Sequence, residues 1–320
     1  MTRGALFGAL LLALSFATAA RAEYPERPIR MIVPFPPGGV VDVVVRIVAD
    51  RLTADLGQQV IVDNKAGAGS VIGTDITAKA PADGYTILLT TPGHTINAAF
   101  RAALPYDAEK DLAPVSIVGQ VPMLLVSHPS LPFRDFKGFV DYARANPGKL
   151  NVGHAGNGTL PHILMELLMV KEHMQVTNVP YRGAGPALAD LVAGQVQAKL
   201  DSYATSAQFI ADHKLNALAV TSAKRLKQLP DVPTVAETGV PDYAGYLWMG
   251  IVVPAATPPS IVDKLGAATR RAVQKPETLA RFDKDGVEPV ANTQAEFRAL
   301  IGREIAQWRE LARQTDIKVE

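Results

Sequence analysis

Two stretches of this chain combine glycines, polar side chains and a following helix in a pattern that can bind an anion. In "PFPPGGVVD" (34–42), prolines end an apolar strand and two glycines precede Asp42, where a helix is expected to begin. In "LNVGHAGNGT" (150–159), a strand is followed by a Gly/Asn-rich turn and by a helix that Asn157 or Thr159 would cap. The first-turn N–H groups of a helix lack intrahelical partners and lie at the positive end of its dipole. Both stretches therefore predict an anion-binding helix start, with a purely structural turn as the alternative.

The absence of lysine and arginine from both stretches restricts the chemistry. One helix terminus contributes about 0.3–2 kcal/mol to anion binding, whereas micromolar affinity requires about 8 kcal/mol. Three or four charge-assisted hydrogen bonds of about 1.5–3 kcal/mol each would supply the difference. A carboxylate held by backbone N–H groups, Asn, Thr and water fits the residues present.

Other chemistries find less support in the sequence. "VIVDNKAGAGSVIG" (60–73) is similar to a dinucleotide-binding loop, but its glycines are spaced G-x-G-x-x-x-G and the next strand, "YTILLTT", lacks a terminal acidic residue. His154 and His162 do not have metal-ligand spacing, and no HExxH motif occurs. The chain has neither a cysteine nor a G-x-S-x-G motif. We therefore expect no metal, nucleotide or other cofactor.

Two single residues allow more than one role. "TTPGHT" (90–95) ends a strand and places His94 in an expected loop, where it either contacts a ligand or packs internally. Asp201 in "DSYATS" follows a strand and is expected to cap the helix that begins near Ala204. An exported hydrolase that uses His94, His154 and Asp201 stays an alternative to a binding protein without chemistry of its own.

The composition describes a soluble globular protein with enough apolar residues for two cores. Of 320 residues, 48% are hydrophobic and 20% are charged, and the formal net charge is +1. No long Lys/Arg run occurs, so a nucleic-acid partner is not expected. Residues 1–22 combine a basic start, a short apolar stretch and "ARA", which predicts a secretory signal peptide cleaved near Ala22. Because no cysteine is available for a lipid anchor, release into the periplasm is expected.

Apolar runs rich in β-branched residues alternate with helical patterns, which predicts an α/β fold with largely parallel sheets. About a dozen strands exceed one ordinary sheet, so two domains with a ligand cleft between them are expected. We expect the chain to cross between them near 120–125 and 221–231, which gives domain 1 as 23–122 with 230–320 and domain 2 as 123–229. Helices are expected at 42–56, 71–80, 136–145, 160–171, 186–192, 204–212 and, packed on domain 1, from Pro259 onward.

Several longer stretches, taken in order, carry a family resemblance. They include "YPERPIRMIVPFPPGGVVD", "LGQQVIVDNKAGAGSVIGTD", "LPYDAEKDLAPVS", "ANPGKLNVGHAGNGT" and "VPYRGAGPALADLVAGQV", and they extend over nearly all of the chain after residue 22. Together they resemble the solute-binding receptors of tripartite tricarboxylate transporters, often called Bug receptors. The resemblance implies a two-domain periplasmic binding protein (type II) that closes like a Venus flytrap on a small carboxylate. It also implies delivery of a di- or tricarboxylate, or of an aromatic acid, to membrane permease subunits.

The same resemblance implies the ligand-binding residues: Phe35, Gly38, Gly39, Asp42, Thr91, His94, Asn157, Gly158 and Thr159, with Tyr181 and Asp201 near the cleft. A valine at Gly38 is expected to crowd the carboxylate. Val40 and Val41 stand where the family often has a hydroxyl residue before the loop aspartate, which favours a less polar acid. A sensor subunit for a membrane kinase would share this binding chemistry and stays a second alternative. Because a flytrap needs only one copy, a monomer is expected.

Overall fold

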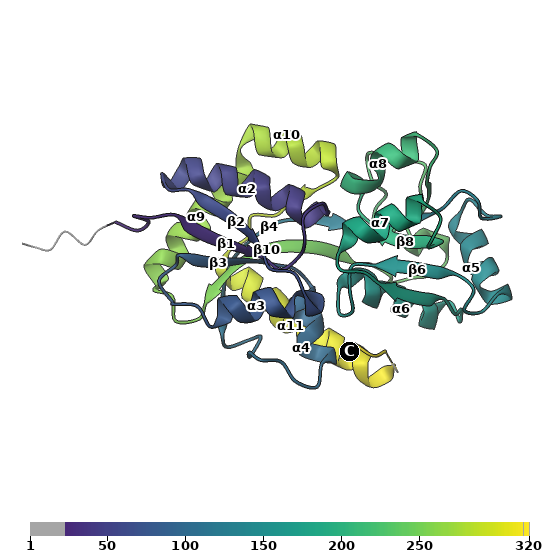
Figure 1. Cartoon of the computed structure of the whole chain (residues 1–320), viewed down its shortest axis with the longest axis horizontal. Coiled ribbons are helices and arrows are strands. Elements are labelled where there is room, and N and C mark those ends of the chain that lie inside the picture. Colours follow the sequence, from purple (N-terminus) through teal and green to yellow (C-terminus); the bar gives the residue numbers. More distant parts are fainter. Residues whose placement is uncertain (1–22, 316, 320) are drawn as a thin grey trace, which may run out of the picture.

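Two α/β units, each built on its own sheet, make up the protein (Figure 1). The computed structural model describes residues 23–315 and 317–319, and the predicted signal peptide lies outside the described residues. Within them, six strands form one sheet in the order β11-β4-β10-β3-β1-β2 and five form the other in the order β7-β6-β8-β5-β9. The expected two-domain α/β arrangement of a type II binding protein is confirmed.

The larger unit contains both ends of the described chain. Its strands are β1 (Ile29–Val33), β2 (Val60–Asn64), β3 (Thr86–Thr90), β4 (Leu112–Pro122), β10 (Tyr246–Pro254) and β11 (Glu288–Pro289). Its α-helices are α2 (Val40–Leu56), α3 (Val71–Ala78), α4 (Gly93–Phe100), α9 (Pro259–Gln274), α10 (Pro276–Asp285) and α11 (Gln294–Gln314). β1 runs parallel to β2 and β3, whereas β10 is antiparallel to both β3 and β4. The sheet is mixed rather than largely parallel, because β4 leaves this unit and its neighbour β10 returns to it.

The smaller unit is continuous in sequence. Its strands are β5 (Leu124–Ser127), β6 (Asn151–His154), β7 (Thr177–Pro180), β8 (Ala198–Asp201) and β9 (Asn216–Val220), and its helices are α5 (Phe136–Ala145), α6 (Leu160–Lys171), α7 (Ala184–Val192) and α8 (Tyr203–Ala211). β6 runs parallel to β7 and β8, whereas β5 is antiparallel to β8 and β9. α6, α7 and α8 follow the parallel strands β6, β7 and β8 within a few residues, which brings the starts of these three helices to one edge of the sheet.

Two crossing segments join the units, and Thr221 of the smaller unit forms hydrogen bonds with both. Met123 alone separates β4 from β5; its N–H donates to Thr221 Oγ1 (2.9 Å), and the Thr221 N–H donates to Met123 O (2.8 Å). The Gly245 N–H in turn donates to Thr221 O at 2.9 Å, just before β10 begins. The paired crossings form a narrow hinge, about which two packed units can rotate.

The first crossing lies inside the expected stretch, but the return crossing lies later than 221–231. The intervening segment stays with the smaller sheet, because Val220 forms a parallel bridge with Thr234 and the Val235 N–H donates to Val220 O at 2.9 Å. The chain re-enters the larger sheet only at Tyr246, which pairs with Pro122. The segment 221–235 is polar and lacks the alternation of a strand, so the sequence did not predict that it stays with the smaller sheet.

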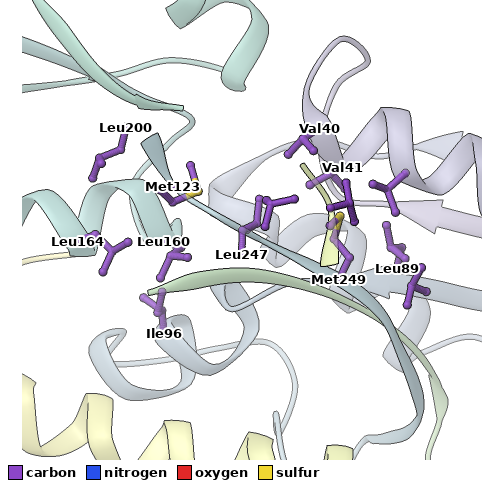
Figure 2. Close-up of a cluster of buried hydrophobic side chains, with 14 of the residues drawn as sticks. Val40, Val41, Leu89, Ile96, Met123, Leu160, Leu164, Leu200, Leu247 and Met249 are labelled. Carbon is purple, nitrogen blue, oxygen red and sulfur yellow. The ribbon is translucent and has the colours of Figure 1, made fainter. Parts of the chain in front are cut away.

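The apolar core continues through the hinge. Figure 2 shows Met123 and Leu160 of the smaller unit in one cluster with Leu247 and Val41 of the larger unit. All four side chains are buried. In α2, buried valines recur three or four positions apart, which gives the helix one apolar face against the sheet. The two units therefore share packed surface beside the crossing strands.

The helices of the larger unit differ from expectation at one place. Gly93 and His94 begin α4 rather than lying in a loop, and the Thr95 hydroxyl donates to Pro92 O (2.9 Å) at the helix start. A helix that opens on glycine lacks the usual start signals, so the sequence did not indicate it. The three expected C-terminal helices are present, and α11 lies along α4 (Figure 1). No helix in the described part of the chain has the length and apolarity to cross a membrane.

Candidate functional site

Two adjoining cavities lie between the units. The outer cavity has a volume of about 520 Å³ and is lined by Pro34, Phe35, Pro36, Ala66, Gly67, Ala68, Gly69, Ser70, Ile72, Arg101, Ala155, Gly156, Asn157, Pro180, Tyr181, Arg182 and Gly183. The inner cavity has a volume of about 50 Å³ and is lined by Phe35, Pro36, Gly39, Val40, Val41, Thr91, Met123, Ala155, Thr159, Leu160, Pro161, Ala184, Lys199, Asp201, Ser202 and Leu247. One water needs about 10–15 Å³, so the inner cavity has room for a few waters or one carboxylate group.

Helix N-termini converge on the inner cavity from both units. Its lining includes Gly39, the N-cap of α2; Thr159, the N-cap of α6; Ser202, the N-cap of α8; and Ala184, the first residue of α7. None of the three N-cap residues uses its side chain to cap the backbone. The positive ends of four helix dipoles therefore meet at a small, largely apolar space, which favours an anionic group there.

A buried ion pair forms one wall of the inner cavity. The Lys199 ammonium lies 2.5 Å from Asp201 Oδ1, and the two residues are 1% and 3% exposed. Asp201 Oδ2 also accepts hydrogen bonds from the hydroxyls of Thr205 (3.0 Å) and Ser206 (2.8 Å) in the first turn of α8. Asp201 thus holds hydroxyl side chains and a lysine instead of capping the α8 backbone as expected. The pair is electrically neutral overall, so the helix termini still set the polarity of the cavity.

Glycines allow the two units to touch across the outer cavity. A Cβ atom on Gly69 would lie 2.0 Å from the backbone oxygen of Asn157, and one on Gly183 would lie 2.3 Å from Cγ of Pro36. Real Cβ atoms do not approach other atoms so closely, so only glycine fits at either position. The structure therefore shows the cleft in a closed arrangement, with the backbone of each unit against the other.

Seven of the eleven sequence-predicted site residues line the cavities. Phe35 lines both; Asn157 and Tyr181 line the outer one; Gly39, Thr91, Thr159 and Asp201 line the inner one. The Tyr181 hydroxyl donates to Asp190 Oδ2 at 2.7 Å, and burial raises the pKa of Tyr181 to about 12, so the phenol stays protonated at neutral pH. The structure brings these residues together at the cleft, and their contact with a ligand stays a prediction.

The other four lie outside the cavity linings. Asp42 accepts two hydrogen bonds of 3.0 Å from Arg46, one turn along α2, and two of 3.4 Å, from the Gly38 N–H and from Asn64 Nδ2. Gly38 is exposed, and a Cβ atom there would meet nothing within 4 Å, so the expected crowding by a valine has no basis in the structure. Its φ of +96° instead explains the glycine. Gly158 packs against Asn97, and His94 is buried under the cleft.

His94 is an internal packing residue. Its Nε2–H donates to Ala108 O at 2.9 Å, its ring stacks on Tyr106 with centroids 6.2 Å apart, and it is 1% exposed. Burial lowers the pKa of His94 from 6.5 to about 4. The neutral ring therefore stabilises the fold fully above about pH 6.5, and this contribution is lost as the pH falls toward 4, because the unfolded chain binds the proton first.

We expect the free energy of unfolding to fall by about 2 kcal/mol between about pH 7 and pH 5 through His94 alone. A His94→Gln variant should lack that part of the slope, whereas His213→Asn, at an exposed position, should keep it. Urea unfolding at the two pH values measures the difference. Equal slopes in His94→Gln and the unsubstituted protein would contradict the prediction.

Sequence reasoning missed three parts of the cavities. The segment 66–70, which in sequence is similar to a dinucleotide-binding loop, lines the outer cavity with all five of its residues. Arg101 and Arg182 line the same cavity, and Lys199 lines the inner one, so basic side chains do reach the cleft. A signal for Lys199 was available, because Lys199 and Asp201 lie two positions apart in β8 and therefore share one face of the strand, where a buried lysine needs a paired charge.

Each residue of the hydrolase alternative has a partner of its own. His94 contacts Ala108, whereas His154 stacks on His162 with ring centroids 4.6 Å apart. Burial lowers the pKa of His154 to about 4, so its ring is neutral. Asp201 is bound to Lys199. Across the described residues, no three His, Cys, Asp or Glu side chains are grouped so that they could hold a metal ion.

The fold and the closed cleft define a two-unit binding protein for a small anion. A family model described as "Tripartite tricarboxylate transporter family receptor" matches residues 44–317. The chain therefore belongs to this family of solute-binding receptors, as the sequence motifs indicated, and the family is one of receptors rather than enzymes.

Individual relatives agree with this assignment. The protein BugT of Bordetella pertussis is 37% identical over 319 residues, which cover 99% of this chain and 98% of BugT. A protein of R. palustris solved with adipate is 33% identical, with a TM-score of 0.87 over 91% of this chain and 98% of that one. MatC from Rhodopseudomonas palustris, solved with bound malate, is 31% identical, with a TM-score of 0.86 over 90% of this chain and 100% of MatC.

Proposed function

We propose that this protein captures a small carboxylate between its two units and delivers it to the permease subunits of a tripartite tricarboxylate transporter. The ligand class is a di- or tricarboxylate or an aromatic acid. The observation that carries the proposal is the convergence of four helix N-termini on the inner cavity. The relatives solved with adipate and malate support a carboxylate as the bound group.

The binding step follows from the hinge and the glycine contacts. In an open form the carboxylate enters between the units, and closure brings Gly69 against Asn157 and Gly183 against Pro36. Closure also expels water, which strengthens each hydrogen bond to the carboxylate. The ligand thus stabilises the closed form by its contacts with both units, and no bond in it is made or broken.

Thermal unfolding of the mature protein tests this function. Each acid of a panel that includes adipate, malate and benzoate is compared with its uncharged amide. At about 100 times its dissociation constant, a ligand adds about 2.7 kcal/mol to the free energy of unfolding, which raises the melting temperature. We expect acids to raise it and amides to leave it unchanged. Equal shifts from acids and amides would rule out a carboxylate clamp.

The remaining assignments are part of the same proposal. The protein acts in the periplasm, as a monomer and without catalysis, so a bound acid should be recovered unchanged after prolonged incubation. The sequence predicts domain 1 as 23–122 with 230–320 and domain 2 as 123–229; because Val220 bridges Thr234 and Tyr246 pairs with Pro122, we propose to move the second boundary to the start of β10. A role as a kinase sensor would show as ligand-dependent capture of a membrane kinase in a pull-down.

A further inference from the structure

The outer cavity carries a positive charge that a clamp for one carboxylate does not require. Arg101 follows α4 in the larger unit and Arg182 precedes α7 in the smaller unit, and both line this cavity. None of the residues that line it is Asp or Glu. Two cations, one from each unit, therefore face a space without a compensating acid.

Protein groups orient one of these arginines but neutralise neither. Arg101 donates from Nε to Asn97 Oδ1 at 2.6 Å and from Nη2 to Ala68 O at 3.3 Å, and both acceptors are uncharged. Arg182 is exposed. Within the described part of the chain neither forms an ion pair, unlike Arg46 with Asp42 and Arg271 with Asp55. A guanidinium has five N–H donors, so Arg101 is held in place with donors left over.

The sizes of the two cavities assign them different parts of a ligand. The inner cavity, at about 50 Å³, has room for one carboxylate group but not for a whole di- or tricarboxylate. The outer cavity, at about 520 Å³, adjoins it at Phe35, Pro36 and Ala155. A ligand with one carboxylate at the helix starts must therefore extend past these residues into the outer cavity.

Arg101 lies at a contact between the two units, beside the outer cavity. A Cβ atom on Gly69 would lie 2.0 Å from Asn157 O of the smaller unit and 3.6 Å from Nη2 of Arg101. The guanidinium thus lies beside the point where the two units touch. Hydrogen bonds to Asn97 and Ala68 of its own unit hold it there.

We propose that the outer cavity is a second anion subsite and that the preferred ligand is an elongated dianion. One carboxylate lies at the helix N-termini, and a second anionic group at the far end of the molecule lies between Arg101 and Arg182. The inference rests on the proposed function and narrows it, since it excludes aromatic and aliphatic acids with a single negative charge as the best ligands.

Titration calorimetry with matched ligands tests the subsite. Glutarate and adipate are each compared with their half-amides, which keep the chain length and remove one charge. The proteins are the unsubstituted chain, Arg101→Gln, Arg182→Gln and the control Arg134→Gln. Arg134 is exposed, bonds only to the uncharged Asn216, and lines neither cavity.

We expect the unsubstituted protein to bind one diacid at least about tenfold more tightly than its half-amide. Arg101→Gln and Arg182→Gln should each remove about tenfold of that preference and leave half-amide affinity nearly unchanged, and Arg134→Gln should change nothing. Equal affinity for diacid and half-amide in the unsubstituted protein would overturn the subsite alone. An equal loss of affinity for the diacid and the half-amide in the arginine variants would also overturn it, because the arginines would then stabilise the closed form and not bind the second anionic group. Failure of every acid to bind would overturn the proposed function as well.

Discussion

Asp201→Asn is expected to lower the free energy of unfolding by about 3–5 kcal/mol, the largest stability effect that the site offers. The substitution keeps the shape of the side chain but leaves the ammonium of Lys199, which is 1% exposed, without its counter-ion. Unpaired buried charges are among the most destabilising changes in a protein interior. Urea unfolding of the mature protein at neutral pH measures the loss.

Two companion variants separate charge from packing. Lys199→Met should be less harmful, because Asp201 keeps the hydroxyls of Thr205 and Ser206 and the start of α8 as partners. The double variant Lys199→Met/Asp201→Asn removes both charges and should recover part of the loss of Asp201→Asn alone. Additive losses in the double variant would show that the two groups do not interact across the cavity wall.

Gly69→Ala is expected to weaken binding of every carboxylate about 10- to 100-fold, because it obstructs closure itself. Its Cβ would lie 2.0 Å from the backbone oxygen of Asn157, which can yield only if the two units separate. Overpacking of this kind costs about 1–3 kcal/mol, and here it falls on the closed form alone. Calorimetry with adipate and with its half-amide should therefore show the same proportional loss.

Gly148→Ala is the matched control. Gly148 has a φ of +72°, close to the +62° of Gly69, but the nearest atom to its Cβ would be Thr177 Oγ1 at 4.0 Å, within the smaller unit. Both alanines strain the backbone similarly and should lower stability by about 1 kcal/mol, whereas only Gly69→Ala should lower affinity. A loss of affinity in both variants would attribute the effect to strain and not to contact between the units.

Local signals predicted most of the secondary structure. β-branched runs gave the strands, and the capping box of Thr293 and Glu296 at α11 is visible in the sequence as Thr-x-x-Glu. The sequence did not predict two features for which local propensity carries no signal. α4 opens on Gly93, and the return crossing lies at Gly245 after a segment held by hydrogen bonds to Val220. Such features depend on partners far away in the chain, which periodicity does not report.

The sequence predicted only part of the site, because some of its residues are positioned by contacts with distant parts of the chain. Loops that follow strands end at one edge of a sheet, so Phe35, Thr91 and Thr159 could be placed at the cleft from strand order and family resemblance. Strand order does not determine whether a polar side chain in such a loop faces the cavity. Asp42 turns to Arg46 along its own helix, and His94 turns inward to Ala108. The orientation of each side chain depends on which hydrogen-bond partner lies close to it in the folded protein.

The sequence by itself determined the family, the α/β class and the two helix starts that favour an anion, since these depend on local patterns and ordered motifs. The tertiary structure alone decided the charge and size of the site. It brought Arg101 and Arg182 to one cavity from positions far apart in the chain, and buried Lys199 against Asp201. It also showed that Gly69 is required for contact between the units. Electrostatic and steric effects act over a few ångströms, and only the folded chain sets which residues lie that close.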